Sequence, residues 1–467
     1  MYLIALESQF MSHRAPPEPS AFLLSSPVAT TMTHPRDRLA PWAKVLLTVS
    51  LASCATYSDR TGGALKDFEQ ASFAHAESVF ADEENTQSTF LSGAEAGLVS
   101  FTDGRYGDAI NHFEQAFVEV VELENAALLD PEALGREMST WALSEELSSY
   151  PGEGYERVLL HAIWGLAYLG LGNVEDMMVE VRRSNRLLAA EERFHQSEYR
   201  SGGLATFLSA IGHELTGQLD EAYIDYKILA KLGVAKSLYG PSLVRISHSL
   251  GLAEASDQWE QEFGPAAEIP VGSARVILIA GLGMGPTKRE VRVSVGTGEG
   301  LLTAVVPEVV RNQHSILPVT LHVSQHAVKT VMLEDVQRLA TESIADRIAW
   351  LAAKSVLRTV IKRELRQKLD KEIGVAGAII GDVFNVATER ADLRCWSTLP
   401  SSWAAARIYV PGGEHSIAVD LPGGPPVDLG RVILSPGETM FVFVRTMNHD
   451  IHARQVGGLL VAPPAEQ

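Results

Sequence analysis

The chain has 467 residues, of which 46% are hydrophobic and 21% are charged, a balance and length typical of a globular protein with more than one core. Its formal net charge is −19, so a phosphate backbone would repel it and we expect no nucleic-acid partner. The only two cysteines, Cys54 and Cys395, are too few for a disulfide framework or a thiolate zinc site.

The N-terminal part of the sequence predicts a secretory signal. An uncharged run, residues 45–53, follows a basic stretch, and it is far shorter than the roughly 20 apolar residues of a transmembrane helix. A basic stretch before a short apolar stretch is typical of a secretory signal. We therefore predict a signal peptide over residues 32–53, preceded by a mis-annotated extension over residues 1–31.

The end of this signal resembles the lipobox of bacterial lipoproteins. Leu51, Ala52 and Ser53 precede Cys54, and the resemblance implies that the Cys54 thiol receives diacylglycerol and becomes the first mature residue. A buried helix with a cysteine there by chance is the alternative. The next residue is Ala55 rather than an aspartate that would retain the protein at the inner membrane. We therefore expect a lipid anchor on the periplasmic side of the outer membrane.

Residues 64–265 have the pattern of a tetratricopeptide-like helical array. Two turn glycines, Gly104 and Gly172, lie 68 residues apart, which is twice a repeat period of about 34 residues. We predict that the following residues form the turns and pack the paired helices: Gly97, Gly104, Tyr106, Ala109 and Phe113, then Gly165, Tyr168 and Gly172, then Ala210, Gly217, Ala222 and Tyr226. An irregular helical bundle would share this periodicity without a concave groove.

An array of this kind offers an inner surface to a peptide or a partner protein. Arg182 and Arg183 belong to a charged stretch of the middle unit, which is either a solvated helix face or a partner contact. Tyr155 and Glu156 follow the helix-breaking residues 151–154. These two residues either begin a capped helix or contact the partner.

From residue 270 the pattern changes from helices to strands, and turns rich in Gly and Pro separate the strands. We predict a small β-sandwich-like domain over residues 270–467 with a helical insert at about 334–390, which makes the whole chain α+β. Residues 274–280 and 290–295 read as paired strands, with a flexible hairpin loop between them. Further strands are expected at 317–323 and 328–333, and hairpin-type pairs at 405–420 and 439–446.

The glycine-rich loop before Lys288 does not predict a nucleotide site. Its glycine spacing resembles a dinucleotide fingerprint, but Pro286 and a strand follow in place of the required helix. His449 and His452 could form a metal pair, but a solvated turn explains them better. We find no catalytic constellation in the sequence, and we expect neither catalytic activity nor a metal or cofactor.

Three stretches resemble one family of uncharacterised bacterial lipoproteins, built from tetratricopeptide-like helices and a C-terminal β-rich region. They are residues 150–172, 285–288 and 390–415, and the last contains Asp392, Arg394 and Trp396. The resemblance implies no activity and only an envelope role. An ion pair that pins the insert to the sandwich would explain Asp392 and Arg394. Together with Lys288 and Trp396, they are also candidate partner contacts.

These observations predict a lipid-anchored envelope scaffold or adaptor that binds a protein or peptide through its repeats, tethered by a linker over residues 54–63. One alternative is a peptidoglycan-acting enzyme or regulator of cell-wall synthesis, and another is a structural subunit of a secretion or surface assembly. A cleft that joins Asp392, His449 and His452 would favour an enzyme. A bare concave helical groove would favour the scaffold.

Overall fold

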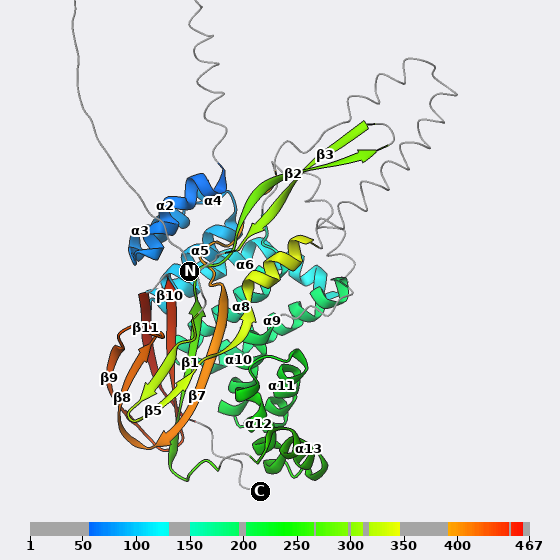
Figure 1. Ribbon diagram of the computed structural model, residues 1–467. Helices are drawn as coiled ribbons and strands as arrows, with labels where there is room; N and C mark the ends of the chain where they lie inside the picture. Colours follow the sequence, from blue (N-terminus) through cyan, green and yellow to red (C-terminus); the bar gives the residue numbers. More distant parts are fainter. Residues whose placement is uncertain are drawn as a thin grey trace, which may run out of the picture. The chain divides into compact units, whose positions relative to one another are not determined.

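The computed structural model describes residues 56–129, 150–195, 202–265, 268–297, 300–311, 317–345, 391–447 and 450–460. Over these residues the chain is mixed α and β, with a helical array in its N-terminal half and sheets in its C-terminal part (Figure 1). The predicted signal peptide, its lipobox with Cys54, His449 and most of the predicted insert lie outside the described residues.

The helices form antiparallel pairs, and each pair contacts the next along the chain. They are α2 (Tyr57–Glu69), α3 (Phe73–Phe80), α4 (Glu83–Thr86), α5 (Thr89–Thr102), α6 (Tyr106–Leu129), α8 (Gly154–Gly170), α9 (Val174–His195), α10 (Gly203–Leu215), α11 (Leu219–Leu232), α12 (Lys236–Ser249) and α13 (Ala253–Phe263). The pairs α5–α6, α8–α9, α10–α11 and α12–α13 make up the body of the array. A further helical stretch, residues 336–345, begins the predicted insert.

Glycines set both the turns and the close approach of the paired helices. Gly104, Gly172 and Gly217 lie in the turns with φ of 83°, 77° and 75°, a region that glycine enters without steric cost. A Cβ on Gly97 would lie 2.4 Å from the Phe113 ring, so only glycine lets α5 and α6 pack this closely. Of the remaining predicted packing residues, Tyr168 is partly buried. The others are buried, and they are Tyr106, Ala109, Gly165, Ala210, Ala222 and Tyr226.

The linker predicted for residues 54–63 is wrong from Tyr57 onward, because α2 begins there. Thr56 is the N-cap, and its hydroxyl accepts a hydrogen bond from the Asp59 N–H while the Asp59 carboxylate accepts the Thr56 N–H. This capping box satisfies two backbone donors at the start of the helix. The adjacent Gly62 and Gly63 within α2 are poor helix formers, which is why the sequence pattern indicates a linker here.

The strands form three sheets. They are β1 (Ser273–Leu282), β2 (Thr287–Thr297), β3 (Gly300–Val310), β4 (Thr320–Val323), β5 (His326–Lys329), β6 (Val331–Asp335), β7 (Ser402–Pro411), β8 (Gly413–Asp420), β9 (Val427–Leu434), β10 (Glu438–Met447) and β11 (Asp450–Leu460). One sheet has the order β11-β10-β1-β7-β6, another has the order β5-β4-β8-β9, and β2 and β3 form a two-stranded ribbon.

Two predicted strand pairings are wrong. β1 pairs with β7 and, in parallel, with β10, rather than with β2. β7 pairs with β1 and β6, whereas β8 pairs with β4 and β9. Each error joined neighbours in sequence, whereas the central strand recruits partners from far along the chain. The predicted flexible loop is instead a buried connection between sheets, in which the Gly285 N–H donates to the Leu399 carbonyl at 2.6 Å.

The five-stranded sheet is covered on both faces. Ile277 and Phe441 belong to the same hydrophobic core as the helices of the array. Val276 and Val442, which point to the opposite face, share a second core with Leu321 of the four-stranded sheet. The central strands therefore read as continuous apolar runs, since neither face meets water.

Candidate functional site

The first helix of each central pair is buried along its length. All residues of α10 are buried, as are those of α5 from Phe90 and almost all of α8. In a helical repeat array such helices line the inner surface, where ligands usually bind. Here that surface packs against the five-stranded sheet and against residues 391–401, which we call the strap. A bare helical surface, which would favour a scaffold, is therefore not seen on these described helices, because the chain itself covers them.

Two buried carboxylates of the inner helices hold the backbone of the strap. Glu95 of α5 accepts the Ser397 N–H at 2.6 Å and the Thr398 N–H at 2.9 Å. Glu156 of α8 accepts the Trp396 N–H at 2.9 Å. Burial raises the pKa of both carboxyl groups above the ordinary glutamate value. The inner surface thus binds an extended segment through its amide groups, as it would bind a peptide, but the segment is its own.

Several predicted partner contacts belong to this buried region. Tyr155, Glu156, Lys288 and Trp396 are each less than a tenth exposed, so they offer no surface to a partner. Lys288 Nζ donates to Glu153 Oε1 at 2.8 Å. Burial lowers the pKa of this ammonium, but the neighbouring carboxylates outweigh it and raise the pKa above the ordinary lysine value. The lysine therefore joins the sheet connection to α8 as a buried ion pair.

Asp392 and Arg394 form the expected ion pair, with Nη2–Oδ2 at 2.9 Å. Arg394 also donates to the Gln87 carbonyl at 2.9 Å, and its guanidinium lies 5.3 Å from the centre of the Tyr150 ring. Gln87 is the residue that ends α4. The pair therefore pins the strap to the helical array, whereas we predicted that it pins the insert to the sandwich.

Cys395 lies inside the strap and is buried. Its Sγ is 3.8 Å from the Pro286 carbonyl oxygen. Burial raises the pKa of the thiol far above the ordinary cysteine value. A buried thiol in this state is not a nucleophile, so its role is to fill space beside the sheet connection.

The second helices of the pairs have an exposed side. On α9 the exposed residues include Val179, Arg182 and Arg186, which recur at helical spacing on one side. On α11 they include Ile224, which is 47% exposed, and Ile228, which is 42% exposed, together with Lys227 and Lys231. We call these seven residues the outer stripe.

Arg182 lies in the outer stripe, whereas Arg183 is only partly exposed. The guanidinium of Arg183 pairs with Glu180 at 3.0 Å and lies 5.0 Å from the centre of the Phe117 ring. Of the two predicted arginines, Arg182 is therefore the one that faces solvent.

A buried histidine lies between two carboxylates, and the sequence pattern did not predict it. His161 of α8 contacts Glu180 through Nδ1 at 2.6 Å and Glu124 through Nε2 at 2.9 Å. Burial lowers the pKa of this imidazole, but the two carboxylates outweigh burial and raise it to about 9. The ring is therefore protonated at neutral pH and joins α8 to α6 and α9.

Glu214 of α10 is a buried carboxylate that was also not predicted, and it joins the helices to the sheet. It pairs with Arg275 of β1 and, at 3.1 Å, with Arg407 of β7, and it accepts the hydroxyl of Tyr226. Burial acts to raise its pKa, but the arginines outweigh burial and lower it to about 2. The signal was present in the sequence: an isolated charge within an apolar helix marks a buried, paired group.

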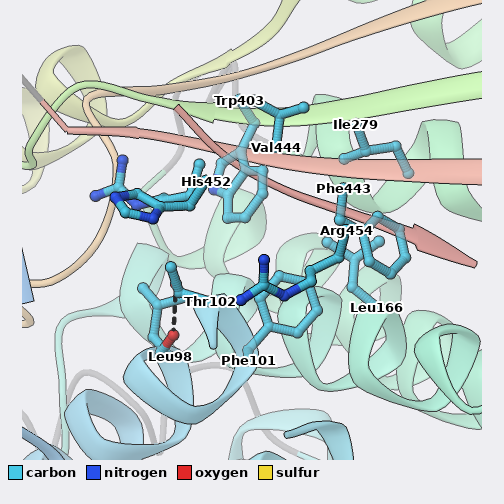
Figure 2. Close-up of a pocket in the computed structure, with 11 residues that line it drawn as sticks. Leu98, Phe101, Thr102, Leu166, Ile279, Trp403, Phe443, Val444, His452 and Arg454 are labelled. Atoms are coloured by element: carbon cyan, nitrogen blue, oxygen red, sulfur yellow. Dashed lines mark hydrogen bonds between the residues drawn. The ribbon is translucent and has the colours of Figure 1, made fainter. Parts of the chain in front are cut away.

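A small pocket lies between α5 and the five-stranded sheet (Figure 2). Its lining includes Leu98, Phe101, Thr102, Trp403, Phe443 and His452. Its free volume is about 10 Å³, which is about the space that one water molecule needs. It is therefore too small for an organic ligand, whose pockets usually measure about 300 Å³ or more.

Two members of the cleft that would favour an enzyme, Asp392 and His452, have different partners in the described residues. Asp392 pairs with Arg394, whereas His452 packs edge-on against Phe73 at 5.3 Å between ring centres, and the two show no contact in the described ranges. Burial lowers the pKa of His452. The described residues also contain no cluster of three metal-ligating side chains. None of the helices in these ranges is both long and apolar enough to cross a bilayer.

Comparisons with known proteins give one structural likeness. No family model matches the chain, and neither does any curated protein. A solved structure that matches is that of PilW, described as a widely conserved type IV pilus biogenesis factor. The sequences are 18% identical, the match covers 44% of this chain and 91% of that chain, and the TM-score is 0.23. A TM-score this low carries no argument about function.

Proposed function

We propose that this protein is a lipid-anchored adaptor of the bacterial envelope, which binds a protein partner through the outer stripe. The observation that carries the proposal is the contrast between the two sides of the array. The inner side is occupied by the chain's own strap and sheet, whereas α9 and α11 expose aliphatic and basic residues together. The helices would be tetratricopeptide-like, and the two stacked sheets would form the β-sandwich.

The outer stripe suggests the chemistry of the partner. Val179, Ile224 and Ile228 would contribute apolar contact, while Arg182 and Arg186 would pair with carboxylates, which arginine binds in a bidentate fashion. The first turns of the same helices expose Glu175, Asp176, Asp220 and Glu221, so the basic side chains lie in the later turns. An acidic polypeptide with apolar anchors fits this surface, and no catalytic step is needed for such a role.

The lipobox resemblance supplies the location. Lipidation of Cys54 would attach the mature protein to the outer membrane, on its periplasmic side. Diffusion of the adaptor would then be confined to two dimensions, and its effective concentration toward a partner in the same membrane would rise. Mass spectrometry of the mature N-terminus tests this part, and an unmodified Cys54 in the membrane fraction would contradict it.

Site-specific photocrosslinking in cells tests the binding surface. We expect a discrete crosslinked product from a photoreactive residue at Val179 and none from one at Asp257, an exposed position on α13. The double variant Arg182→Glu/Arg186→Glu should abolish the product. The control Lys66→Glu/Lys329→Glu makes the same change of charge at two exposed lysines elsewhere and should leave the product intact. Equal products from both probe positions would refute the proposed surface.

A further inference from the structure

The folded body begins almost immediately after the predicted lipidation site. Thr56 already caps α2, and its backbone N–H is held by the Asp59 carboxylate at 2.9 Å. Only Ala55 separates this cap from Cys54. The chain offers no flexible spacer here, in contrast to the linker that the sequence pattern predicts.

The first turn of α2 is fixed to the array. Tyr57 is 5% exposed, and its hydroxyl donates to Glu95 Oε1 at 2.6 Å, the same carboxylate that holds the strap. Thr61, one turn later, is also buried. Fraying of this turn would therefore expose a buried tyrosine and leave a hydrogen bond unmade. Three residues of extended chain span about 10 Å, which limits the distance between Cys54 and Tyr57.

The surface around this end is polar and acidic. Asp59, Asp82, Glu83 and Glu84 are exposed, and over residues 56–90 every large apolar side chain is at least partly buried. Such a surface can lie against lipid headgroups, but it has nothing to insert among acyl chains. The other end of the array is α13, because the contacts run in order from α2 to α13.

We infer that the α2–α4 end of the array lies at the headgroups of the bilayer and that α13 points away from it. The inference rests on the proposed lipidation of Cys54. Neighbouring helices pack about 10 Å apart, so α13, four helix pairs further along, lies about 40 Å from the anchored end. The outer stripe, on pairs between the two ends, is then held at a defined height above the membrane.

Energy transfer in vesicles tests this orientation. The lipidated mature protein would be reconstituted into vesicles that contain a headgroup-labelled phosphatidylethanolamine as acceptor. A donor dye would be attached through Glu84→Cys on α4 or Glu262→Cys on α13, both exposed positions, since the buried Cys395 resists labelling. We expect strong transfer from the first position and several-fold weaker transfer from the second. Brominated acyl chains should quench neither dye.

A spacer variant serves as the matched control. Twenty Gly and Ser residues inserted after Ala55 would give a tether with a mean span of about 25 Å, and the difference between the two dyes should largely disappear. Equal transfer from both positions in the protein without the spacer would overturn the orientation while leaving lipidation intact. Absence of the fatty acids from Cys54 by mass spectrometry would overturn both proposals.

Discussion

The inner and outer helices of the array differ in what surrounds them. α5, α8 and α10 are buried on all sides and carry ionisable groups such as Glu95 and His161, each with specific partners. α9 and α11 bury one side and expose the outer stripe. A substitution on the inner helices should therefore change stability, whereas a substitution on the outer stripe should change binding alone. Four predictions test this division.

The largest effect is expected for Glu95→Ala. The change removes the acceptor of the Ser397 and Thr398 amides and of the Tyr57 and Ser397 hydroxyls, and it leaves four buried donors unpaired. We expect the free energy of unfolding to fall by about 3 to 5 kcal/mol, measured by urea denaturation of the soluble Cys54→Ser protein. Glu84→Ala, at an exposed position, is the control and should change it by less than about 0.5 kcal/mol. Similar losses of unfolding free energy in both variants would mean that buried and exposed glutamates do not differ in their contribution to stability.

His161 should make stability depend on alkaline pH. Its folded pKa of about 9 lies above the value of 6.5 for an unperturbed histidine. The ion pairs with Glu124 and Glu180 therefore contribute fully below pH 6.5, and their contribution is lost as the pH rises through 9. The loss should amount to at most about 3 kcal/mol. The loss is measured as the fall in the urea midpoint between pH 6 and pH 10. This fall should be smaller in His161→Gln, because that variant lacks the contribution of the imidazole.

Two glycine substitutions should act in opposite directions. Gly97→Ala places a Cβ 2.4 Å from the Phe113 ring, so overpacking should cost about 1 to 3 kcal/mol. Gly107→Ala, on α6, meets nothing within 4 Å and should stabilise the helix by up to about 1 kcal/mol. Thermal unfolding of the two variants measures both changes, and we expect a lower Tm for Gly97→Ala and a higher Tm for Gly107→Ala. A stabilising Gly97→Ala would mean that the helix pair is less tightly packed than described.

The smallest effect on stability is expected in the outer stripe. Arg182→Ala removes an exposed side chain, so the free energy of unfolding should change by less than about 0.5 kcal/mol. Crosslinking from Val179 should nevertheless weaken. If Arg182→Ala lowers the free energy of unfolding as much as Glu95→Ala does, exposed residues of the outer helices contribute to stability as the buried ones do. The proposed difference between the inner and outer helices would then be wrong.

Local signals predicted much of the helical half. The turn glycines and the small residues at the helix crossings act between neighbours in sequence, so Gly104 and Gly97 could be identified from spacing alone. Individual strands could be identified for the same reason. The mixed α and β architecture, with helices before sheets, follows from these two patterns.

Long-range contacts could not be predicted in this way. Nothing near Ala274 indicates that β1 will pair with β7 and β10, because sequence alternation describes a strand and not its neighbour. The strap was expected to offer Trp396 to a partner, yet Glu156 of the same chain holds its backbone. Glu95, the single charge of the apolar helix α5, signals a buried and paired group, but the sequence does not say which groups pair with it. Its meaning depends on amide groups about 300 residues away, with separations of 302 to Ser397 and 303 to Thr398.

The parallel pairing of β1 with β10 also determines when the protein can be completed during synthesis. Arg275 and Thr439 are 164 residues apart, and chains are made from the N-terminus. Phe101 of α5, whose ring centre lies 5.5 Å from that of Phe443, therefore lacks this cover until β10 emerges. Folding that depends on such distant contacts is slow, and the partly folded intermediate that lacks β10 is prone to aggregate. A nascent chain truncated before β10 should be the species that a chaperone must shield.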